Sequence, residues 1–394
     1  MPAERHILPI IVFSQFCCTS LWFAGNAVMA DLLLNYNLNA SALGHLTSAV
    51  QFGFISGTLI FAIFGIADRF SPSKVFLVCA LLGAVFNFSI ISEGNTLNSL
   101  LFLRFLTGFS LAGIYPVGMK IATDYYQKGL GTSLGFLVGA LVLGTAFPHF
   151  LKDIAATGAL PWKTVLITTS LLSVLGGLLI FCFIPDGPYR QPKLKKDFSA
   201  AFNVFRNSRF RAAAFGYFGH MWELYAFWAF VPVALQIYQK IHPGAIFNIP
   251  LLSFLVIGSG GFACVIGGYV SKKIGTRYTA ATALFLSGFC CLISPLLLLQ
   301  NSPTALIIFL IFWGFMVVAD SPLFSTLVAQ NAIAESRGTA LTITNSIGFG
   351  ITIISIQLIN LLMGIINPIY LFVFLAIGPA FGLWAIFRKN SSEV

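Results

Sequence analysis

The sequence predicts an all-α polytopic membrane protein with twelve transmembrane helices in two pseudo-symmetric six-helix bundles. Its composition is the first reason for this prediction. Of 394 residues, 58% are hydrophobic and only 9% are charged, whereas soluble domains carry about 25% charged residues. The 36 glycines suit close packing of membrane helices, because small residues let backbones approach one another. The second reason is a pattern that occurs twice.

The internal repeat has an offset close to half the chain length. Residues 108–116 read GFSLAGIYP and residues 314–322 read GFMVVADSP, so the two copies begin 206 residues apart. GTSL at 131–134 corresponds to GTAL at 338–341, and Leu21-Trp22 corresponds to Phe227-Trp228. Such an offset in an apolar chain indicates two similar membrane halves, an architecture that many secondary transporters use.

Apolar segments recur along the whole chain, each near the ~20 residues that cross a bilayer as a helix. The first segment is too long and too polar for a cleaved signal peptide, so we expect it in the mature protein. The twelve predicted segments are 8–34, 43–66, 75–92, 97–119, 130–149, 162–184, 212–238, 249–270, 278–299, 303–328, 338–364 and 367–387.

Charge placement sets the predicted orientation. With the N-terminus inside, the opposite face holds only Lys152, Lys163 and Lys240 of the 22 basic residues. Arg104 lies inside a helix, and the others fall in cytoplasmic parts. This is the positive-inside bias, and it places both termini in the cytoplasm of a cell that we expect to be bacterial, with the chain in its cytoplasmic (inner) membrane. The net charge of +10 therefore needs no nucleic-acid partner.

The stretch 185–211 begins with Pro and Gly and is rich in basic residues. We predict it to be a cytoplasmic linker between an N-terminal bundle (1–184) and a C-terminal bundle (212–394). All seven cysteines fall in predicted membrane segments without metal-ligand spacing. No Ser/His/Asp set, HExxH or nucleotide loop is found. The sequence thus predicts no enzyme, no catalytic or metal site and no prosthetic cofactor.

Two loops carry a family resemblance. The loop after the second helix reads FGIADRFSPSK, with Asp68 and Arg69, and the mirror loop reads GYVSKKIGTR. Together they are similar to the Gly-x-x-x-Asp-Arg/Lys-x-Gly-x-Arg/Lys element of the major facilitator superfamily, and the resemblance covers the whole chain. It implies that the loops act as ionic gates; the alternative is an ordinary solvated turn. The mirror-loop residues concerned are Gly268, Lys272, Lys273, Gly275 and Arg277.

Buried charge is expensive in lipid, so ionisable residues inside helices are candidate functional residues. Arg104 opens RFLTGFSLAG, which resembles the fourth-helix element of the superfamily; the resemblance implies proton coupling or binding of an anionic substrate. The alternative is a structural clamp on neighbouring carbonyl groups. Asp31, near the outer end of the first helix, is a further candidate for proton coupling.

The second half contributes acids. His220 and Glu223 are three residues apart and so share one helix face, where they are predicted to form a proton-binding pair; Asp320 is a second coupling candidate. The alternative for each is hydrogen bonding within the bundle. Polar and aromatic residues predicted to line the substrate cavity are Trp22, Asn26, Gln51, Tyr115, Trp222, Tyr225, Trp228, Asn345 and Gln357.

The predicted function is secondary active transport of a small organic solute by alternating access, in a monomer that uses the proton gradient in place of a cofactor. Proton-driven efflux of amphiphilic compounds is an alternative, and so is a non-transporting sensor. Symport and antiport both remain open. The pattern also resembles the nitrate/nitrite- and cyanate-type branch, whose oxyanion carriers place Arg on the second and eighth helices. Neither segment has one here.

Overall fold

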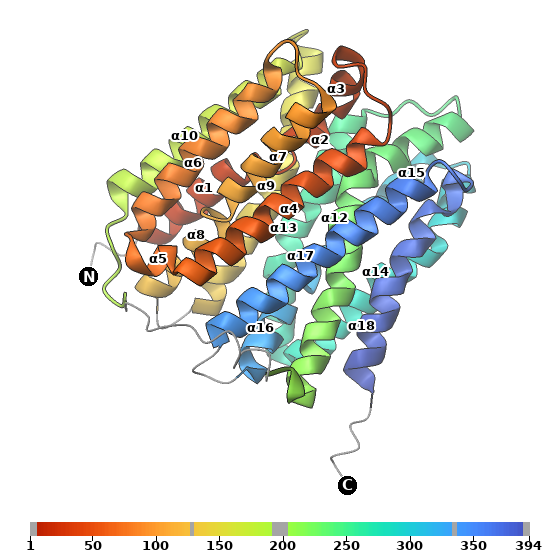
Figure 1. Cartoon of the computed structure of the whole chain (residues 1–394). Helices are drawn as coiled ribbons and strands as arrows, with labels where there is room; N and C mark the ends of the chain where they lie inside the picture. Colours follow the sequence, from red (N-terminus) through yellow and green to blue (C-terminus); the bar gives the residue numbers. More distant parts are fainter. Residues whose placement is uncertain (1–5, 127–129, 191–203, 333–336, 389–394) are drawn as a thin grey trace. The chain divides into compact units, whose positions relative to one another are not determined.

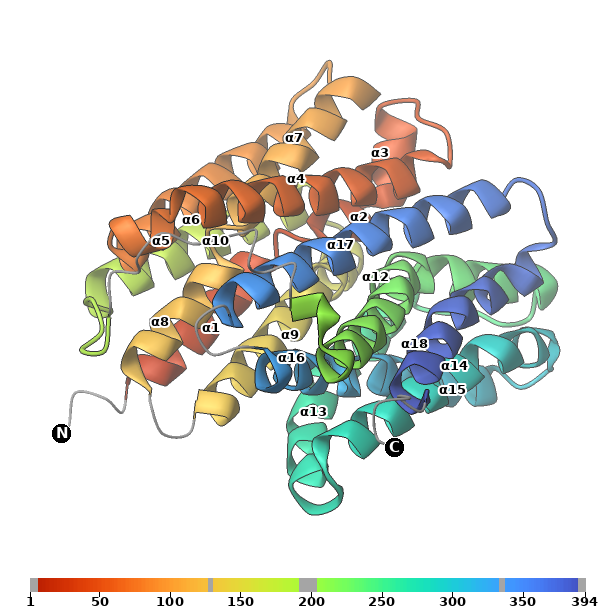
Figure 2. The ribbon, with the colours of Figure 1, turned by 60° about the horizontal axis from the view of Figure 1, so that its bottom comes forward.

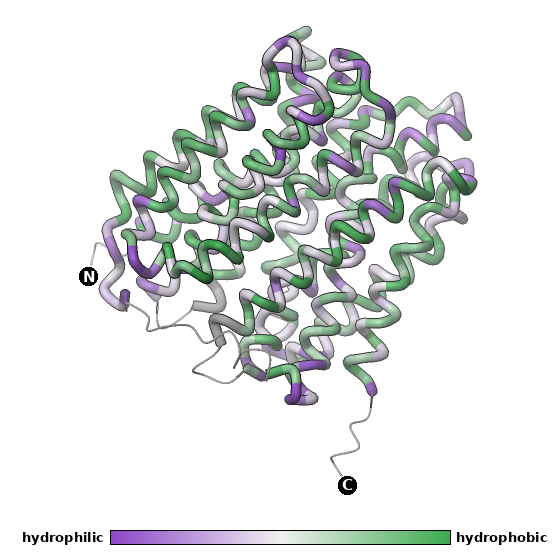
Figure 3. The backbone as a smooth tube through the Cα atoms, viewed as in Figure 1, coloured by the Kyte–Doolittle hydropathy of each residue, from purple (hydrophilic) through white to green (hydrophobic). Residues whose placement is uncertain are grey.

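The computed structural model describes residues 6–126, 130–190, 204–332 and 337–388. The regular structure in these ranges is helical, and ten of the described helices are long and apolar enough to cross a membrane. Apolar residues follow the helices, and many of the polar ones lie near the turns (Figure 3). The predicted class of all-α polytopic membrane protein is therefore confirmed.

The predicted N-terminal segments are all found as helices (Figure 1). The first is broken into three pieces, α1 (Ile7–Thr19), α2 (Ala24–Ala27) and α3 (Met29–Asn35). The others are α4 (Ala42–Phe64), α5 (Ile66–Arg69), α6 (Pro72–Phe88), η2 (Ser89–Ile91), α7 (Leu97–Leu111), α8 (Tyr115–Tyr125), α9 (Leu130–Thr157) and α10 (Lys163–Phe183).

The C-terminal segments are found as well. The last of them begins as a 3-10 helix, η5 (Pro368–Ala376), and continues as α18 (Ile377–Phe387). The others are η3 (Val204–Arg206), α12 (Ser208–Ile241), α13 (Ile249–Ile274), α14 (Thr276–Leu299), α15 (Pro303–Ala319), α16 (Ser321–Asn331) and α17 (Arg337–Leu362).

The chain divides into two compact units. The first comprises Met1–Leu194 with Asn248–Gly261, and the second comprises Lys195–Phe247 with Phe262–Val394. Helix α13 is thus divided between them. The predicted bundles 1–184 and 212–394 stay a prediction, and residues 191–203 of the linker lie outside the described residues.

Glycines allow close helix packing in the first unit. Helices α4 and α7 run side by side (Figures 1 and 2). A Cβ atom on Gly53 would lie 1.9 Å from the carbonyl oxygen of Phe105, and one on Gly108 would lie 2.0 Å from that of Val50. In a membrane the hydrophobic effect does not drive helices together, and helices associate through such small residues. Gly176 and Gly177 of α10 face α1 and α6 in the same way.

In the second unit, α12 is the central helix and packs on α16, α17 and α18. Gly219 of α12 approaches Gly378 at the start of α18 so closely that a Cβ atom would lie 2.4 Å from a carbonyl oxygen. Gly348 of α17 faces Tyr217 and Met221 of α12. Three faces of α12 are therefore used for helix contacts, which explains why most of its length is buried.

The repeated sequence pattern coincides with a repeated helix break. Helix α7 ends at Leu111 and α8 begins at Tyr115, while α15 ends at Ala319 and α16 begins at Ser321. Pro116 and Pro322 each stand in the first turn of the second helix. Proline is tolerated there because the first N–H groups of a helix have no intrahelical partner.

One predicted boundary is wrong by about two turns. The segment 130–149 was expected to end after Pro148, but α9 continues to Thr157 with this proline inside. Neighbouring helices let a membrane helix tolerate an internal proline. His149 is consequently a buried residue of the helix interior, and Lys152 belongs to the last turns of the same helix.

The close α4–α7 packing gives a first prediction. Gly53→Ala places a methyl group against the backbone of α7, and we expect a loss of roughly 1–3 kcal/mol of stability. Gly135→Ala is the matched control, because nothing lies within 4 Å of a Cβ atom there and alanine favours a helix by roughly 0.5–1 kcal/mol. Thermal unfolding in detergent measures both. Equal melting temperatures would contradict the close packing.

Candidate functional site

Glu223 is fully buried in the second unit and accepts hydrogen bonds from two other helices. The indole N–H of Trp313 lies 2.6 Å from Oε1, and the hydroxyl of Ser287 lies 2.8 Å from Oε2. The thiol of Cys291 also reaches Oε1, at 3.3 Å. Helices α14 and α15 therefore supply three donors, which is the partner set that an acceptor-only carboxylate requires.

His220 pairs with Asp320, one turn of α12 away from Glu223. Nδ1 of His220 lies 2.8 Å from Oδ1 of Asp320, and both side chains are almost completely buried. Oδ2 of Asp320 and Nε2 of His220 have no hydrogen-bond partner among the described residues. The pair is ionic when the imidazole is protonated. Asp320 stands at the break between α15 and α16, which is why it can turn toward α12.

His220 and Glu223 have different hydrogen-bond partners, and their predicted role as a proton-binding pair stays a prediction. The two residues do share one face of α12, as their spacing requires. One turn of helix nevertheless separates them, so His220 meets Asp320 whereas Glu223 meets α14 and α15. Asp320 contacts His220, and His220 lies three residues from Glu223 on the same helix. The three groups form one buried cluster of two acids and one imidazole, which we call the acid cluster.

The aromatic residues predicted on α12 contact other rings and backbone, and Tyr217 of the same helix lies beside His220, with ring centroids 6.1 Å apart. Tyr225 and Trp228 pack edge to face, with ring centroids 5.2 Å apart, and Tyr225 also meets Phe349 of α17. Trp222 turns to another neighbour and donates to the carbonyl of Phe374 at 3.2 Å. The indole beside Glu223 is that of Trp313. Asn345 and Gln357 lie half-buried on α17.

Arg104 holds the break in the first span. Its guanidinium donates to the carbonyl of Leu21 at 3.1 Å and to that of Trp22, between the end of α1 and the start of α2. A broken membrane helix leaves carbonyl groups that lipid cannot satisfy. Gly25 makes room, since a Cβ atom there would lie 3.3 Å from Nε of Arg104. This contact is the clamp that the sequence left as the alternative; a role in coupling stays a prediction.

Three of the predicted cavity residues come together beside this clamp. The amide of Asn26 donates to the hydroxyl of Thr47 at 2.8 Å, and Trp22 packs against Phe54 in a tilted arrangement with centroids 4.8 Å apart. Gln51 lies between Thr47 and Phe54 on the same face of α4 and is fully buried. Neither its Oε1 nor its Nε2 has a hydrogen-bond partner in the part of the chain that the structure describes. Tyr115 lies half-buried at the start of α8.

Asp31 has a partner in its own unit. Lys152 of α9 lies 2.7 Å from its Oδ2, and both side chains are partly exposed. Ion pairs of this kind at a helix end contribute little energy. The proton-coupling role predicted for Asp31 is not tested by this contact.

The first predicted gating loop forms an ionic network within the first unit. Oδ1 of Asp68 lies 3.2 Å from Nζ of Lys120, which also meets Asp124 at 3.4 Å. Arg190 forms an ion pair with Asp186 and donates to the carbonyl groups of Asp68 at 3.3 Å and of Phe70 at 2.9 Å. Arg69 is exposed.

The second loop has different contacts, and gating by either loop stays a prediction. Gly275 has a φ of 91°, a conformation that favours glycine. Arg277 donates to the carbonyl of Ile386, and Lys272 lies over the ring of Tyr269. Lys273 and Gly268 lie along the last turns of α13.

Several residues of the two sites were missed by the sequence analysis. Trp313, Ser287 and Cys291 carry no charge, and only their contact with Glu223 singles them out. His149, in the interior of α9, was not singled out by the sequence analysis. Groups of three or more potential metal-binding residues are not found in the described part of the chain.

A family model described as Major Facilitator Superfamily matches residues 11–356. The chain belongs to the major facilitator superfamily. It is thus a secondary transporter with the fold of that family, and not an enzyme.

Relatives of known name agree with this family membership. The chain is 24% identical over 362 residues to the cis,cis-muconate transport protein of Acinetobacter baylyi. The alignment covers 81% of this chain and 81% of that protein. It is 25% identical over 191 residues to the putative uncharacterized transporter YgaY of Escherichia coli, covering 46% of each. These names describe the relatives.

Solved structures of the superfamily share the fold. A variant of the nucleoside transporter NupG aligns with a TM-score of 0.74 at 16% identity, covering 97% of this chain and 99% of that chain. A bacterial homolog of the human lysosomal transporter Spinster, inward-facing and unoccupied, aligns with a TM-score of 0.71 at 17% identity over 100% of both chains. At these identities the likeness shows the fold alone.

The clamp at the α1 break gives a second prediction for this superfamily member. Arg104→Met leaves the carbonyls of Leu21 and Trp22 without their charged donor, and each such hydrogen bond contributes roughly 1.5–3 kcal/mol. We expect a clear drop in melting temperature in detergent, and a smaller drop for Arg104→Lys, which lacks the planar fork. Arg69→Met, at an exposed position, is the control. A melting temperature of Arg104→Met equal to that of the wild type would rule out the clamp.

Proposed function

We propose that the chain transports a small organic solute by alternating access and couples this to proton movement through the acid cluster. The observation that supports the proposal most directly is the set of hydrogen-bond partners of Glu223. Trp313 can only donate, whereas the hydroxyl of Ser287 can donate or accept. The set therefore suits both protonation states of the carboxyl group.

The hydrogen bonds of Glu223 can be specified for its ionised and its protonated state. When Glu223 is ionised, Ser287 donates to Oε2 at 2.8 Å and Trp313 donates to Oε1 at 2.6 Å. When it is protonated, the new O–H can donate to the hydroxyl of Ser287, which then donates to the carbonyl of Leu284, 3.2 Å away. Trp313 keeps its acceptor in both states. No buried group loses its partner when the proton leaves.

The burial of the acid cluster explains why a proton would bind there. A charged group without compensation is costly inside an apolar bundle, and the acid cluster holds two carboxyl groups but only one imidazole. With His220 protonated and Asp320 ionised, a protonated Glu223 makes the cluster neutral. Release of this proton leaves one negative charge buried. The free-energy cost of that charge depends on the surroundings of the cluster, so a change in these surroundings shifts the balance between proton uptake and release. Intramembrane acids in transporters commonly serve as proton relays.

The solute is proposed to be a small organic acid. The relative from Acinetobacter baylyi is named a cis,cis-muconate transport protein, and Arg104 supplies a buried cation in the first unit. Gln51, whose amide has no partner, offers a donor and an acceptor close to Trp22 and Asn26. Helices α4 and α13 carry no arginine, which favours an organic anion over the oxyanions of the nitrate-type branch.

We further propose that both termini are cytoplasmic, as the distribution of basic residues predicts, and that the chain works as a monomer in a bacterial cytoplasmic membrane. The resemblance to the nitrate/cyanate-type branch stays a prediction.

The proton-coupling proposal predicts the behaviour of Glu223→Gln. The amide keeps an acceptor for Trp313 and a donor for Ser287, so the variant resembles the protonated state and should fold. We expect solute counterflow to persist in proteoliposomes, while accumulation driven by a pH gradient and its pH dependence fall to background. A pH-sensitive dye inside the vesicles measures the proton flux, whose sign distinguishes symport from antiport. We expect Asp320→Asn to weaken the same coupling.

Glu93→Gln is the matched control, because the side chain of Glu93 is 97% exposed. It should couple as the wild type does. If Glu223→Gln retained both proton-driven accumulation and its pH dependence, the acid cluster would not be the coupling site.

The proposed solute predicts that substitution of Gln51 lowers the affinity for the solute without lowering the stability of the protein. A buried amide without partners costs stability, so Gln51→Leu should keep or raise the melting temperature. It should also weaken binding of cis,cis-muconate or a related small carboxylate by roughly ten- to a hundredfold, because a hydrogen bond to a charged group contributes roughly 1.5–3 kcal/mol. Ligand-induced thermal stabilisation and transport kinetics measure both quantities.

Asn87→Leu is the control for a buried amide that has partners. Asn87 donates to Leu166, Thr169 and Ser170 at 3.0–3.2 Å, so this variant should lose stability and keep its affinity. Binding of lipophilic cations in place of carboxylates would favour amphiphile efflux. Binding without any counterflow would favour a sensor.

A further inference from the structure

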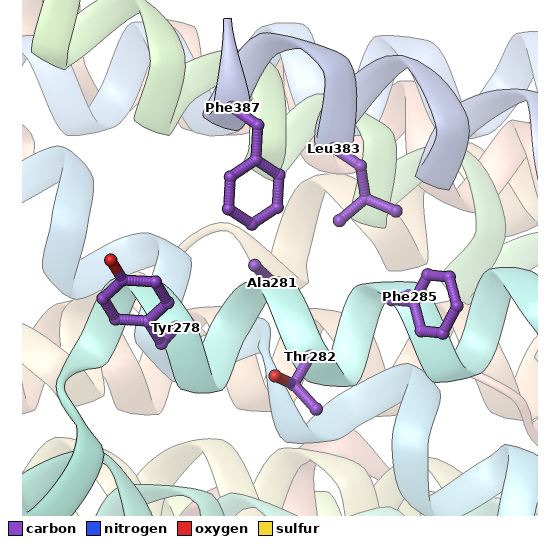
Figure 4. Close-up of a pocket in the computed structure, with 6 residues that line it drawn as sticks. All are labelled: Tyr278, Ala281, Thr282, Phe285, Leu383 and Phe387. Atoms are coloured by element: carbon purple, nitrogen blue, oxygen red, sulfur yellow. The ribbon is translucent and has the colours of Figure 1, made fainter.

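A groove lies between α14 and α18 in the second unit, apart from the acid cluster. Its volume is about 330 Å³, within the roughly 300–1,000 Å³ typical of small-molecule sites. Ala281 lies on the α14 side and Leu383 on the α18 side (Figure 4). The other lining residues are Tyr278, Thr282, Phe285 and Phe387. The lining is mostly apolar, and the three aromatic side chains are about half exposed or more.

Two arginines stand at one end of this groove. Arg277 directly precedes Tyr278 in α14, and Arg388 directly follows Phe387 of α18. Arg277 donates to the carbonyl of Ile386, two residues before Arg388, so the start of α14 and the end of α18 meet. Helices α14 and α18 contain no acidic residue that would neutralise this end. The apolar groove therefore ends close to two basic residues.

Contacts within the protein restrict both arginines. The guanidinium of Arg388 lies over the ring of Trp384, 5.1 Å from its centroid. That of Arg277 is tied to the backbone of α18. Side chains restricted in this way lose less conformational freedom when they bind a ligand. Arginine also binds phosphate groups through two parallel hydrogen bonds.

We propose that this groove binds one molecule of an anionic phospholipid. One acyl chain lies along Ala281, Phe285 and Leu383, and the headgroup phosphate meets Arg277 and Arg388. The distribution of basic residues predicts this end of the helices to be cytoplasmic, so the lipid belongs to the inner leaflet. Bulk lipid would cover any apolar surface, whereas two arginines at this end of the groove would favour a negative headgroup.

The test uses the full-length protein in nanodiscs with equal amounts of phosphatidylglycerol and phosphatidylcholine that carry identical acyl chains. After transfer to detergent, native mass spectrometry counts the lipid that remains bound. We expect one phosphatidylglycerol per protein in preference to phosphatidylcholine. Arg388→Gln should reduce this preference by roughly fivefold, the effect of one basic side chain near a charged lipid surface.

Two further variants separate the groove from its charge. Leu383→Trp fills the apolar part and leaves both arginines in place, so it should also release the lipid. Lys74→Gln removes an exposed basic residue of α6 in the first unit and should retain the wild-type preference. Thermal unfolding of each variant verifies that the helices remain folded.

Besides retention in Leu383→Trp, three results would overturn the proposal. They are equal retention of both lipids by the wild type, a preference unchanged in Arg388→Gln, and an equal loss in Lys74→Gln. The last of these would indicate attraction by net charge alone. Retention that survives Leu383→Trp would place the lipid outside this groove.

Discussion

The structure depends on polar groups that satisfy one another inside helix bundles, because hydrocarbon supplies no hydrogen-bond partners. In the first unit, the break after α1 would leave carbonyl groups bare, and Arg104 binds two of them. In the second unit, Glu223 would be an uncompensated acid, and α14 and α15 supply its donors. Each of these contacts ties one helix to others far away in the sequence.

Close packing makes these contacts geometrically feasible. Gly25 leaves space for the guanidinium of Arg104, and Gly53 and Gly108 bring α4 and α7 into backbone contact. In the second unit Gly219 and Gly378 do the same for α12 and α18. Glycine thus serves here less as a flexible residue than as the residue that permits short distances between helices.

The two halves repeat a backbone and differ in chemistry. Both copies of the repeated pattern break a helix and place a proline in its next turn. Arg104, however, has Leu310 as its counterpart 206 residues later, and Asp320 has Ile114. The first unit therefore holds the buried cation Arg104 and, among the described residues, the buried amide of Gln51 without a hydrogen-bond partner, whereas the second holds the acid cluster. Such a division suits a transporter in which anion recognition and proton binding are separate tasks.

The membrane class, the helical segments and the repeat could be predicted from the sequence, because apolar length and periodicity are local properties. Arg104, Glu223 and Asp320 could be identified in the same way, since charges inside apolar helices are evident in the sequence. Their partners became known from the packed structure: carbonyl groups for Arg104, Trp313 and Ser287 for Glu223, and His220 for Asp320. Helix spacing defines which residues share a face, but which helix meets that face depends on packing between residues distant in the chain.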